Sequence, residues 1–242
     1  HNVYSYFLQT TTEGFTVIQI NGLNKALFGG GHKVNILNGI DLVIPSGQFV
    51  AITGASGSGK TTLLSLIAGL DEPTGGNIKI NDQDITKLNE DELAELRSQH
   101  FGFIFQNFNL IPTLTALENV TLSAELNGSN GTQKKSTELL SLVGLANRNY
   151  HYPSQLSGGE QQRLSLARAF INEPSIVLAD EPTGNLDSQN SKRILDLMTD
   201  LHRNKKSTIA LVTHEPDVAK KAERIIVMDD GKIVQDSLPL SK

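Results

Sequence analysis

The chain has 242 residues, enough for one large domain, and its 38% hydrophobic and 19% charged content is ordinary for a globular protein. Its 26 acidic residues outnumber the 21 basic ones, so it lacks the positive field on which non-specific binding to DNA or RNA depends. We therefore expect no nucleic acid partner. The absence of cysteine excludes disulfides and thiolate metal sites.

The apolar runs of the sequence are short. Segments such as SIVLAD (175–180) and RIIVMDD (224–230) fall far below the roughly 18 residues of a membrane span. The first 13 residues have neither the basic nor the long apolar segment of a signal peptide, so we expect a frayed or cloning-derived extension there. The remaining residues, 14–242, are predicted to form one domain.

The first predicted elements are strands without helices between them. Residues 14–23 and 34–47 have strand character, and the GGG at 29–31 is typical of a turn. Short strands in succession indicate a small antiparallel sheet. QFVAIT (48–53) is then a continuous apolar run of buried-strand length, followed by a glycine loop and a helical pattern over 61–70.

The rest of the chain is predicted to alternate between helices and strands. We expect a hairpin over 75–85, a short acidic helix over 89–99 and a strand over 101–106. From about 113 to 172 the pattern is almost wholly helical, which predicts a helical insertion. Three β-rich runs, at 175–180, 207–213 and 224–230, are separated by helical stretches. This alternation is typical of an α/β fold with a parallel sheet covered by helices.

The glycine loop matches a phosphate-binding template. GASGSGKT (54–61) has the G-x-x-x-x-G-K-[ST] pattern between a buried strand and a helix. Glycines let successive amides converge on one anion, which also meets the positive end of the helix dipole. Lys60 can reach the β- and γ-phosphates and the Thr61 hydroxyl can ligate Mg²⁺. The predicted nucleotide contacts are Gly54, Ala55, Ser56, Gly57, Ser58, Gly59, Lys60, Thr61 and Thr62.

Two acidic residues end the apolar run SIVLAD. Ligands collect at the carboxyl ends of strands in α/β sheets, and adjacent side chains on a strand point to opposite faces. Asp180 and Glu181 should therefore have different roles. We expect Asp180 to hold Mg²⁺ beside the phosphate loop and Glu181 to polarise an attacking water.

A second glycine pair lies in LSGGEQQR (156–163). Ser157, Gly158 and Gly159 stand at the start of a helix with apolar residues at spacings of three and four. This arrangement can serve as a second anion site or as a plain helix cap, and the residues alone leave both open.

Six motifs in order resemble the ATP-binding-cassette (ABC) family of ATPases, from about Val17 to the end of the chain. The resemblance implies a P-loop NTPase (RecA-like) core with a mixed sheet, an N-terminal antiparallel β-subdomain and an inserted helical signature subdomain at about 113–172. The motifs are the phosphate loop, Gln106 in IFQ, LSGGEQQR, the acidic strand end, NLD (185–187) and VTHE (212–215).

The resemblance also implies roles for single residues. Gln106 resembles the glutamine that contacts Mg²⁺ and the lytic water, His214 the histidine that contacts the γ-phosphate, and Asp187 the aspartate that communicates across a dimer. The family usually stacks adenine on an aromatic residue in its first strands. Phe28, in NKALFGGG, is the candidate here, although its register is one residue off.

In the family, the signature serves the nucleotide of another chain. The resemblance therefore implies a homodimer with two ATP molecules, in which Ser157, Gly158 and Gly159 face the partner's γ-phosphate. ATP closes such a dimer and hydrolysis reopens it.

The sequence around the motifs resembles that of the ATPases of lipoprotein-release, macrolide-export and peptide-resistance systems. This implies a cytoplasmic chain held at the inner face of the membrane by a separate permease that docks near Gln106. Regulation of a cell-envelope enzyme through a membrane anchor is the alternative. A small P-loop kinase would leave the signature, NLD and VTHE unexplained. The docking candidates, which could equally be core residues where they are phenylalanines, are Phe105, Asn107, Phe108 and Asn109.

Overall fold

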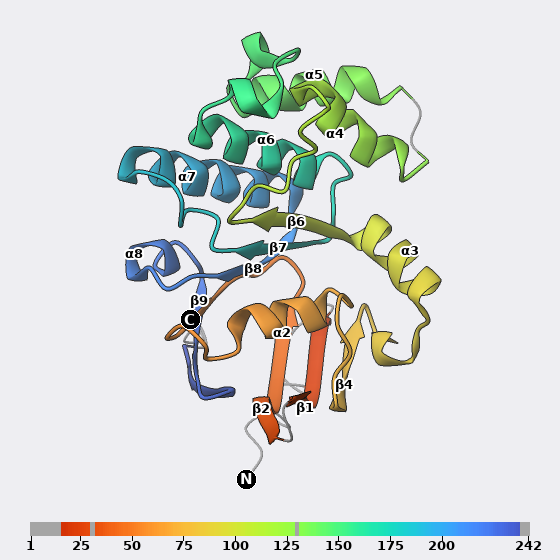
Figure 1. Ribbon diagram of the computed structural model, residues 1–242, viewed down its shortest axis with the longest axis vertical. Helices are drawn as coiled ribbons and strands as arrows, with labels where there is room; N and C mark the ends of the chain where they lie inside the picture. The colour runs from red at the N-terminus through yellow and green to blue at the C-terminus, as the bar shows by residue number, and fades with distance from the viewer. Residues whose placement is uncertain (1–15, 30–31, 129–130, 238–242) are drawn as a thin grey trace.

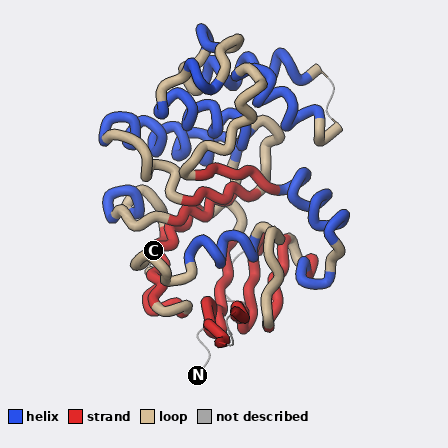
Figure 2. The backbone as a smooth tube through the Cα atoms, viewed as in Figure 1, coloured by secondary structure: helices blue, strands red, loops and turns tan. Residues whose placement is uncertain are grey.

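The N-terminal part of the chain builds the first of two sheets. In the computed structural model, which describes residues 16–29, 32–128 and 131–237, β1 (Thr16–Gly29) pairs antiparallel with β2 (His32–Pro45) (Figures 1 and 2). β4 (Gly75–Ile80) and β5 (Gln83–Asp84) complete the order β2-β1-β4-β5. The predicted extension 1–13 and most of the predicted GGG turn lie outside the described residues.

The prediction of short strands is wrong for β1 and β2. Each has 14 residues, and their pairing is interrupted by several shifts of register, one of them between Ile20 and Leu23. A β-bulge adds a residue to one strand and increases its twist and bend. Bulges therefore allow two long strands to belong to one small, strongly twisted sheet.

The second sheet is mixed, as the resemblance implied. Its order is β10-β9-β3-β8-β7-β6, in which only β10 is antiparallel to its neighbour. The predicted β-rich runs form its central strands. Their bounds are β3 (Phe49–Thr53), β6 (Phe101–Phe105), β7 (Ile176–Asp180), β8 (Thr208–Val212), β9 (Arg224–Asp229) and β10 (Lys232–Asp236).

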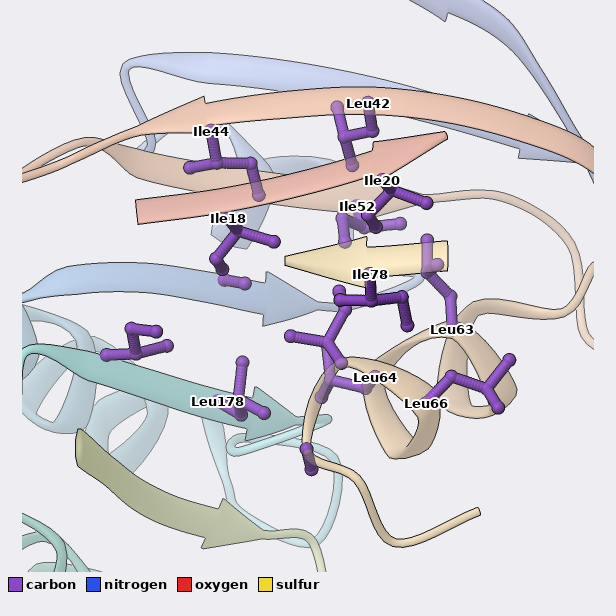
Figure 3. Packing of buried hydrophobic residues seen from close by; sticks show 14 of the residues in the cluster. Ile18, Ile20, Leu42, Ile44, Ile52, Leu63, Leu64, Leu66, Ile78 and Leu178 are labelled. Atoms are coloured by element: carbon purple, nitrogen blue, oxygen red, sulfur yellow. The ribbon is translucent and has the colours of Figure 1, made fainter. Parts of the chain in front are cut away.

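One core fills the space between the two sheets around α2 (Lys60–Ile67), which lies between them (Figure 1). Alternate strand residues such as Ile52 and Leu178 face this core together with Ile18 and Ile78 of the first sheet (Figure 3). Full burial of an isoleucine or leucine side chain contributes about 1.5–3 kcal/mol. This packing fixes α2, and with it the phosphate loop, against the strands.

A second core lies on the opposite face of the mixed sheet. Strand residues next in sequence to those of the first core point to this face, because side chains alternate along a strand. Among them are Phe49, Val177 and Ile209, which pack against helices. The helical layers at the top of Figure 1 cover this core. The helices involved are α4 (Ala116–Glu125), α5 (Thr132–Leu142), α6 (Gly158–Phe170), α7 (Ser188–Lys205) and α8 (Pro216–Ala219).

The helical stretch predicted over 113–172 is confirmed as helical, although its status as a subdomain stays a prediction. It contains α4, α5 and α6 and the short 3₁₀ turns η2 (Ala146–Arg148) and η3 (Pro153–Gln155). Capping boxes, in which a polar side chain and a glutamate three residues later bond each other's amides, fix the starts of several helices. Such boxes are present at the N-termini of α3 (Glu90–His100), α4 and α6. The 3₁₀ turn η1 (Ile85–Lys87) precedes α3.

Candidate functional site

The phosphate loop lies at the edge of the mixed sheet where the parallel strands end. β3 leads into it, and the neighbouring β8 and β7 end beside it, before His214 and at Asp180. Glu181 follows β7 directly, and its amide donates to the Val212 carbonyl (3.0 Å). The topology therefore brings three separate sequence motifs to one edge.

The loop needs its glycines for two different reasons. Gly54, Gly57 and Gly59 have φ of 146°, 82° and 97°, values at which a side chain is strained. A Cβ on Gly54 would also lie 2.1 Å from the Met228 carbonyl oxygen. Any larger residue at Gly54 would therefore push the loop away from β9.

Lys60 is folded back onto its own loop. Its Nζ donates to the carbonyls of Gly54 (2.9 Å) and Ala55 (2.8 Å), and the residue is buried. The Ser58 hydroxyl is buried without a hydrogen-bond partner among the described residues. A concavity that holds an ammonium group and an unpaired hydroxyl suits an anion.

Thr61 and Asp180 meet beside the loop, as predicted for a metal site. The Thr61 hydroxyl donates to Asp180 Oδ1 (3.2 Å), and burial raises the pKa of Asp180 although this hydrogen bond lowers it. A hydroxyl and a carboxylate are oxygen donors that suit Mg²⁺. Across the described ranges no three His, Cys, Asp or Glu side chains form a metal-binding group.

Glu181 and His214 form a direct pair. His214 Nδ1 donates to Glu181 Oε1 (2.8 Å), and this bond raises the pKa of His214. Glu181 Oε2 is buried and has no hydrogen-bond partner within the described part of the chain. Glu181 also has φ of +47°, an unfavourable conformation for a residue with a side chain, and such strain is common at functional sites. One carboxylate oxygen is thus held and the other is free to accept a proton.

Gln106 is positioned by the segment that follows Glu181. Asn185 Nδ2 donates to the Gln106 carbonyl (3.1 Å) and to Asn107 Oδ1 (3.2 Å). A Cβ on Gly184 would lie 2.8 Å from Gln106 Nε2, so the backbone must pass close there. Neither Asn185 nor Gly184 has a role predicted from sequence, although both lie between the predicted Glu181 and Asp187.

These groups share one cleft of about 600 Å³. The cleft brings together six of the nine predicted phosphate-loop contacts with the glutamine, the strand-end glutamate and the histidine, whereas Gly54, Ala55 and Ser58 do not line it. Asp180 does not line it but is bonded to Thr61, which does. The lining residues are Ile36, Ser56, Gly57, Gly59, Lys60, Thr61, Thr62, Gln106, Glu181 and His214.

Phe28 does not line this cleft. Its ring is 75% exposed, so it is no core residue, and Lys33 Nζ lies 5.9 Å from its centroid. Leu27, the preceding residue, is 54% exposed and points to the other face of the strand. A role for Phe28 in binding the base stays a prediction.

The signature lies outside the cleft, at the start of α6. Ser157 caps the helix: its hydroxyl accepts from the Glu160 amide (3.3 Å) and donates to Glu160 Oε2 (2.9 Å). The cap predicted as one alternative is therefore present. It leaves the amides of Gly158 and Gly159 with no bonded partner among the residues the structure describes, and two such amides at a helix N-terminus can still bind an anion.

Two further contacts tie the signature to the acidic strand end. A Cβ on Gly159 would lie 2.4 Å from Asn190 Oδ1, and Asn190 is held by Asp187, which caps α7. Gln162 Nε2 donates to the Pro182 carbonyl (2.7 Å). No sequence pattern indicated these roles, because Gln162 meets Pro182, and Asn190 meets Gly159, only across separate segments of the chain.

The residues after Gln106 border a separate cavity of about 460 Å³. Phe105 stacks on Phe103 (ring centroids 5.8 Å apart), and Phe108 and Asn109 have positive φ. Arg168 of α6 donates to the carbonyls of both Phe108 (2.9 Å) and Asn109. The turn formed by Phe108 and Asn109 is thus hydrogen-bonded to α6, the helix that begins with the signature.

Known proteins resemble this chain over most of its length. A family model described as ABC transporter matches residues 37–184. The macrolide export ATP-binding/permease protein MacB of Rhodopirellula baltica is 46% identical over 225 residues, which are 91% of this chain and 33% of that protein. The ABC transporter ATP-binding protein YbbA of Escherichia coli K12 is 42% identical over 91% of this chain and 98% of its own length. The chain thus spans about one third of the length of the MacB relatives that it matches.

Solved structures agree as well. The ATP-binding cassette MJ0796, in a dimeric post-hydrolysis state bound to ADP and Pi, superposes with a TM-score of 0.86 at 39% identity, covering 93% of this chain and all of that one. A second dimeric structure of MJ0796 gives the same TM-score at 40% identity. Within residues 16–29, 32–128 and 131–237, no helix has the length and apolarity to span a bilayer. The chain belongs to the ABC transporter family and is its ATPase domain, which binds ATP with Mg²⁺.

Proposed function

We propose that this domain supplies the energy for an export system that also has a membrane-spanning permease part. ATP closes a dimer of cassettes and hydrolysis reopens it, so that the cycle moves the attached permease. The observation that supports this best is the single cleft shared by Lys60, Thr61, Gln106, Glu181 and His214. The relatives named for macrolide export support the export direction.

In the proposed site, residues 54–62 hold the phosphates through their amides. Lys60 exchanges its bonds to the Gly54 and Ala55 carbonyls for bonds to the β- and γ-phosphates. Thr61, Asp180 and Gln106 hold Mg²⁺, which when bound offsets the negative charge of the phosphates. Phe28 is the proposed support for the base.

Hydrolysis is proposed to depend on the free oxygen of Glu181. Because Oε2 has no hydrogen-bond partner within the described ranges while Oε1 is fixed by His214, Oε2 can accept a proton from an attacking water. His214, with 63% of its side chain exposed, can at the same time reach the γ-phosphate. Gln106, which lines the same cleft, orients the water.

The second cradle is proposed to serve the partner. Ser157, Gly158 and Gly159 do not line the cleft of their own chain, and the amides of Gly158 and Gly159, which have no partner among the described residues, can take a phosphate from another chain. Two copies related by a twofold axis supply it, because each phosphate loop then faces the other chain's signature. The dimeric form of the related cassette supports this arrangement. Asp187, next to the signature through Asn190, is placed to sense the partner.

The permease is proposed to dock beside Gln106. The 460 Å³ cavity there is lined by apolar side chains, among them Phe105 and Ile111, and by about as many polar ones, and its lining residues Leu70 and Leu126 are exposed. Phe108 and Asn107 stand next to it. A cytoplasmic helix in this cavity would act on Gln106 through a few residues of backbone, and it would hold the chain at the inner face of the membrane.

Regulation of a cell-envelope enzyme through a membrane anchor was the alternative function. The relatives found here are named for export or as transporter ATP-binding proteins, which favours the export proposal. We further propose that residues 14–242 act as one domain, with 113–172 as a helical unit that carries the signature.

A reconstituted complex tests the proposal. The chain is purified alone and with the membrane protein encoded beside its gene, and phosphate release from MgATP is measured in both. We expect hydrolysis by the chain alone and a severalfold change with the partner. Phe108→Asp should abolish the change, while Leu142→Asp, at an exposed position on α5, should not. A partner without effect on hydrolysis would contradict the transport proposal.

A further inference from the structure

An ion pair supports the signature from outside its motif. Arg148, the last residue of η2, donates from Nε to Glu160 Oε1 (3.0 Å). The other carboxylate oxygen, Oε2, accepts from the amide (2.9 Å) and the hydroxyl (2.9 Å) of Ser157. Both oxygens of Glu160 are therefore engaged, one by the signature and one by Arg148.

This arrangement keeps a negative charge next to the second cradle. The hydrogen bond from the Ser157 amide, followed by that from Arg148, lowers the pKa of Glu160 to about 2. Glu160 is thus ionised at every pH at which the protein works. A phosphate oxygen bound to the free amides of Gly158 and Gly159 would lie beside the same first turn of α6 from which Glu160 projects. Two like charges held so close together repel each other.

We propose that Arg148 is a positioning residue for the partner's nucleotide, which offsets the charge of Glu160 so that the γ-phosphate can approach Ser157, Gly158 and Gly159. Arg148 does not touch the nucleotide. It allows Glu160 to hold the serine cap without repelling the phosphate. The inference rests on the proposed dimer and adds to it a residue that lies eight positions before the signature.

A purely structural role for the pair makes a different prediction. If Arg148 only fastens Glu160 in place, a variant that lacks both charges is as defective as one that lacks the arginine. If Arg148 offsets charge, removal of the glutamate charge repairs the loss of the arginine. Glu160→Gln is suited to this test because glutamine also forms a capping box and retains the oxygen that accepts from Ser157.

The experiment measures dimerisation by analytical ultracentrifugation, with ATP and with ADP. All variants carry Glu181→Gln, which slows hydrolysis and preserves the ATP-bound state. We expect Arg148→Ala to raise the dimer dissociation constant about tenfold. Arg148→Ala with Glu160→Gln should return to within about threefold of Glu160→Gln alone, and Arg148→Lys should stay near the parent. The Arg148→Ala defect should shrink at high salt, since salt screens exposed charges.

Lys134→Ala is the matched control. It removes one positive charge from an exposed position on α5 of the same helical layer, where the one ion pair of Lys134 among the described residues is with Glu138. It should leave dimerisation unchanged. Urea unfolding and binding of a fluorescent ATP analogue to the monomer show whether each variant is folded with an intact phosphate loop.

Two results would overturn the inference about Arg148 alone. They are a dimerisation constant of Arg148→Ala equal to that of the parent, and a double variant as weak as Arg148→Ala. If the parent itself fails to dimerise with ATP, the proposed dimer is wrong and the role of Arg148 falls with it. If Lys134→Ala is as weak as Arg148→Ala, the effect is one of overall charge, and the specific role of Arg148 is refuted.

Discussion

The two glycine cradles of this chain place backbone amides at a helix N-terminus in different surroundings. The phosphate loop shares its cleft with a lysine, a hydroxyl bonded to a carboxylate, and a glutamate with a free oxygen. In the signature, the amides of Gly158 and Gly159 have no partner among the described residues. Both carboxylate oxygens of Glu160 are occupied, one by the Ser157 cap and one by the ion pair with Arg148. The first cradle therefore holds what binding and chemistry require, whereas the second can only complete a site that begins elsewhere.

Their packing differs in the same sense. α2 lies between two sheets, so the phosphate loop is part of the most constrained layer of the molecule (Figure 1). α6 belongs to the helical layer, and its contacts to the loop after Glu181 include the single hydrogen bond from Gln162 to Pro182. A signature that moves relative to the phosphate loop would be free to open and close a shared site.

The largest effect that separates the two cradles is expected at Glu181. Glu181→Gln should lower turnover about 10²- to 10⁴-fold, because an amide fills the same space but cannot act as a base. ATP binding should remain, so ATP-dependent dimers should accumulate. Phosphate release and size-exclusion chromatography measure the two properties. Turnover at the parental rate would remove Glu181 from its proposed role.

The next prediction tests whether the cradles act across two chains. Lys60→Ala cannot hold its own phosphates, and Gly158→Asp places a carboxylate where the partner's phosphate would bind. A Cβ on Gly158 meets nothing closer than 3.8 Å, so the second change should not disturb folding. Each variant should be inactive alone. Mixed dimers keep one intact composite site, so an equal mixture should recover about a quarter of the parental rate.

The control for this mixture is the double variant. Added to either single variant, it should restore nothing, because both composite sites of each mixed dimer then carry a lesion. Dimerisation should be followed alongside phosphate release. Mixed dimers could form without any recovery of ATP hydrolysis, while the parent mixed with the double variant stays active. The signature would then serve its own chain, and the proposed difference between the two cradles would be wrong.

A smaller effect is expected at the base. Phe28→Ala should raise the dissociation constant for ATP about 5- to 100-fold with little change in the maximal rate, because a stacking platform contributes roughly 1–3 kcal/mol. The paired variant Leu27→Ala tests the opposite face of the strand. An effect of Leu27→Ala without one of Phe28→Ala would transfer the base-binding role to Leu27.

The smallest effect is a pH dependence within the first cradle. Because the hydrogen bond to Glu181 raises the pKa of His214 above 6.5, protonated His214 stabilises the fold fully below pH 6.5. This stabilisation is lost as the pH rises through the raised value. In His214→Ala, the free energy of unfolding should therefore fall less steeply above pH 6.5 than in the parent. Urea unfolding at several pH values measures this. Parallel curves for the two proteins would refute the contribution of this pair.

The sequence by itself determined the features that short windows encode. Eight consecutive residues, 54–61, specify the loop, because its glycines, lysine and threonine act within one turn of backbone. The meeting of Asp180 with Thr61 also followed from sequence, because parallel strands end at a common edge. Ser157 and Glu160 have the spacing of a capping box, so the cap at the signature was readable as well.

Tertiary structure alone decided the contacts between distant segments. Glu181 and His214 are 33 residues apart, and Gln106 and Asn185 are 79 apart, yet each pair is in contact. Their meeting depends on how strands are ordered and where loops turn, which no local pattern contains. The length of β1 and β2 was likewise hidden, since a bulge adds a residue without changing the composition of the strand. Whether the amides of Gly158 and Gly159 remain free could be decided only once every neighbour was in place.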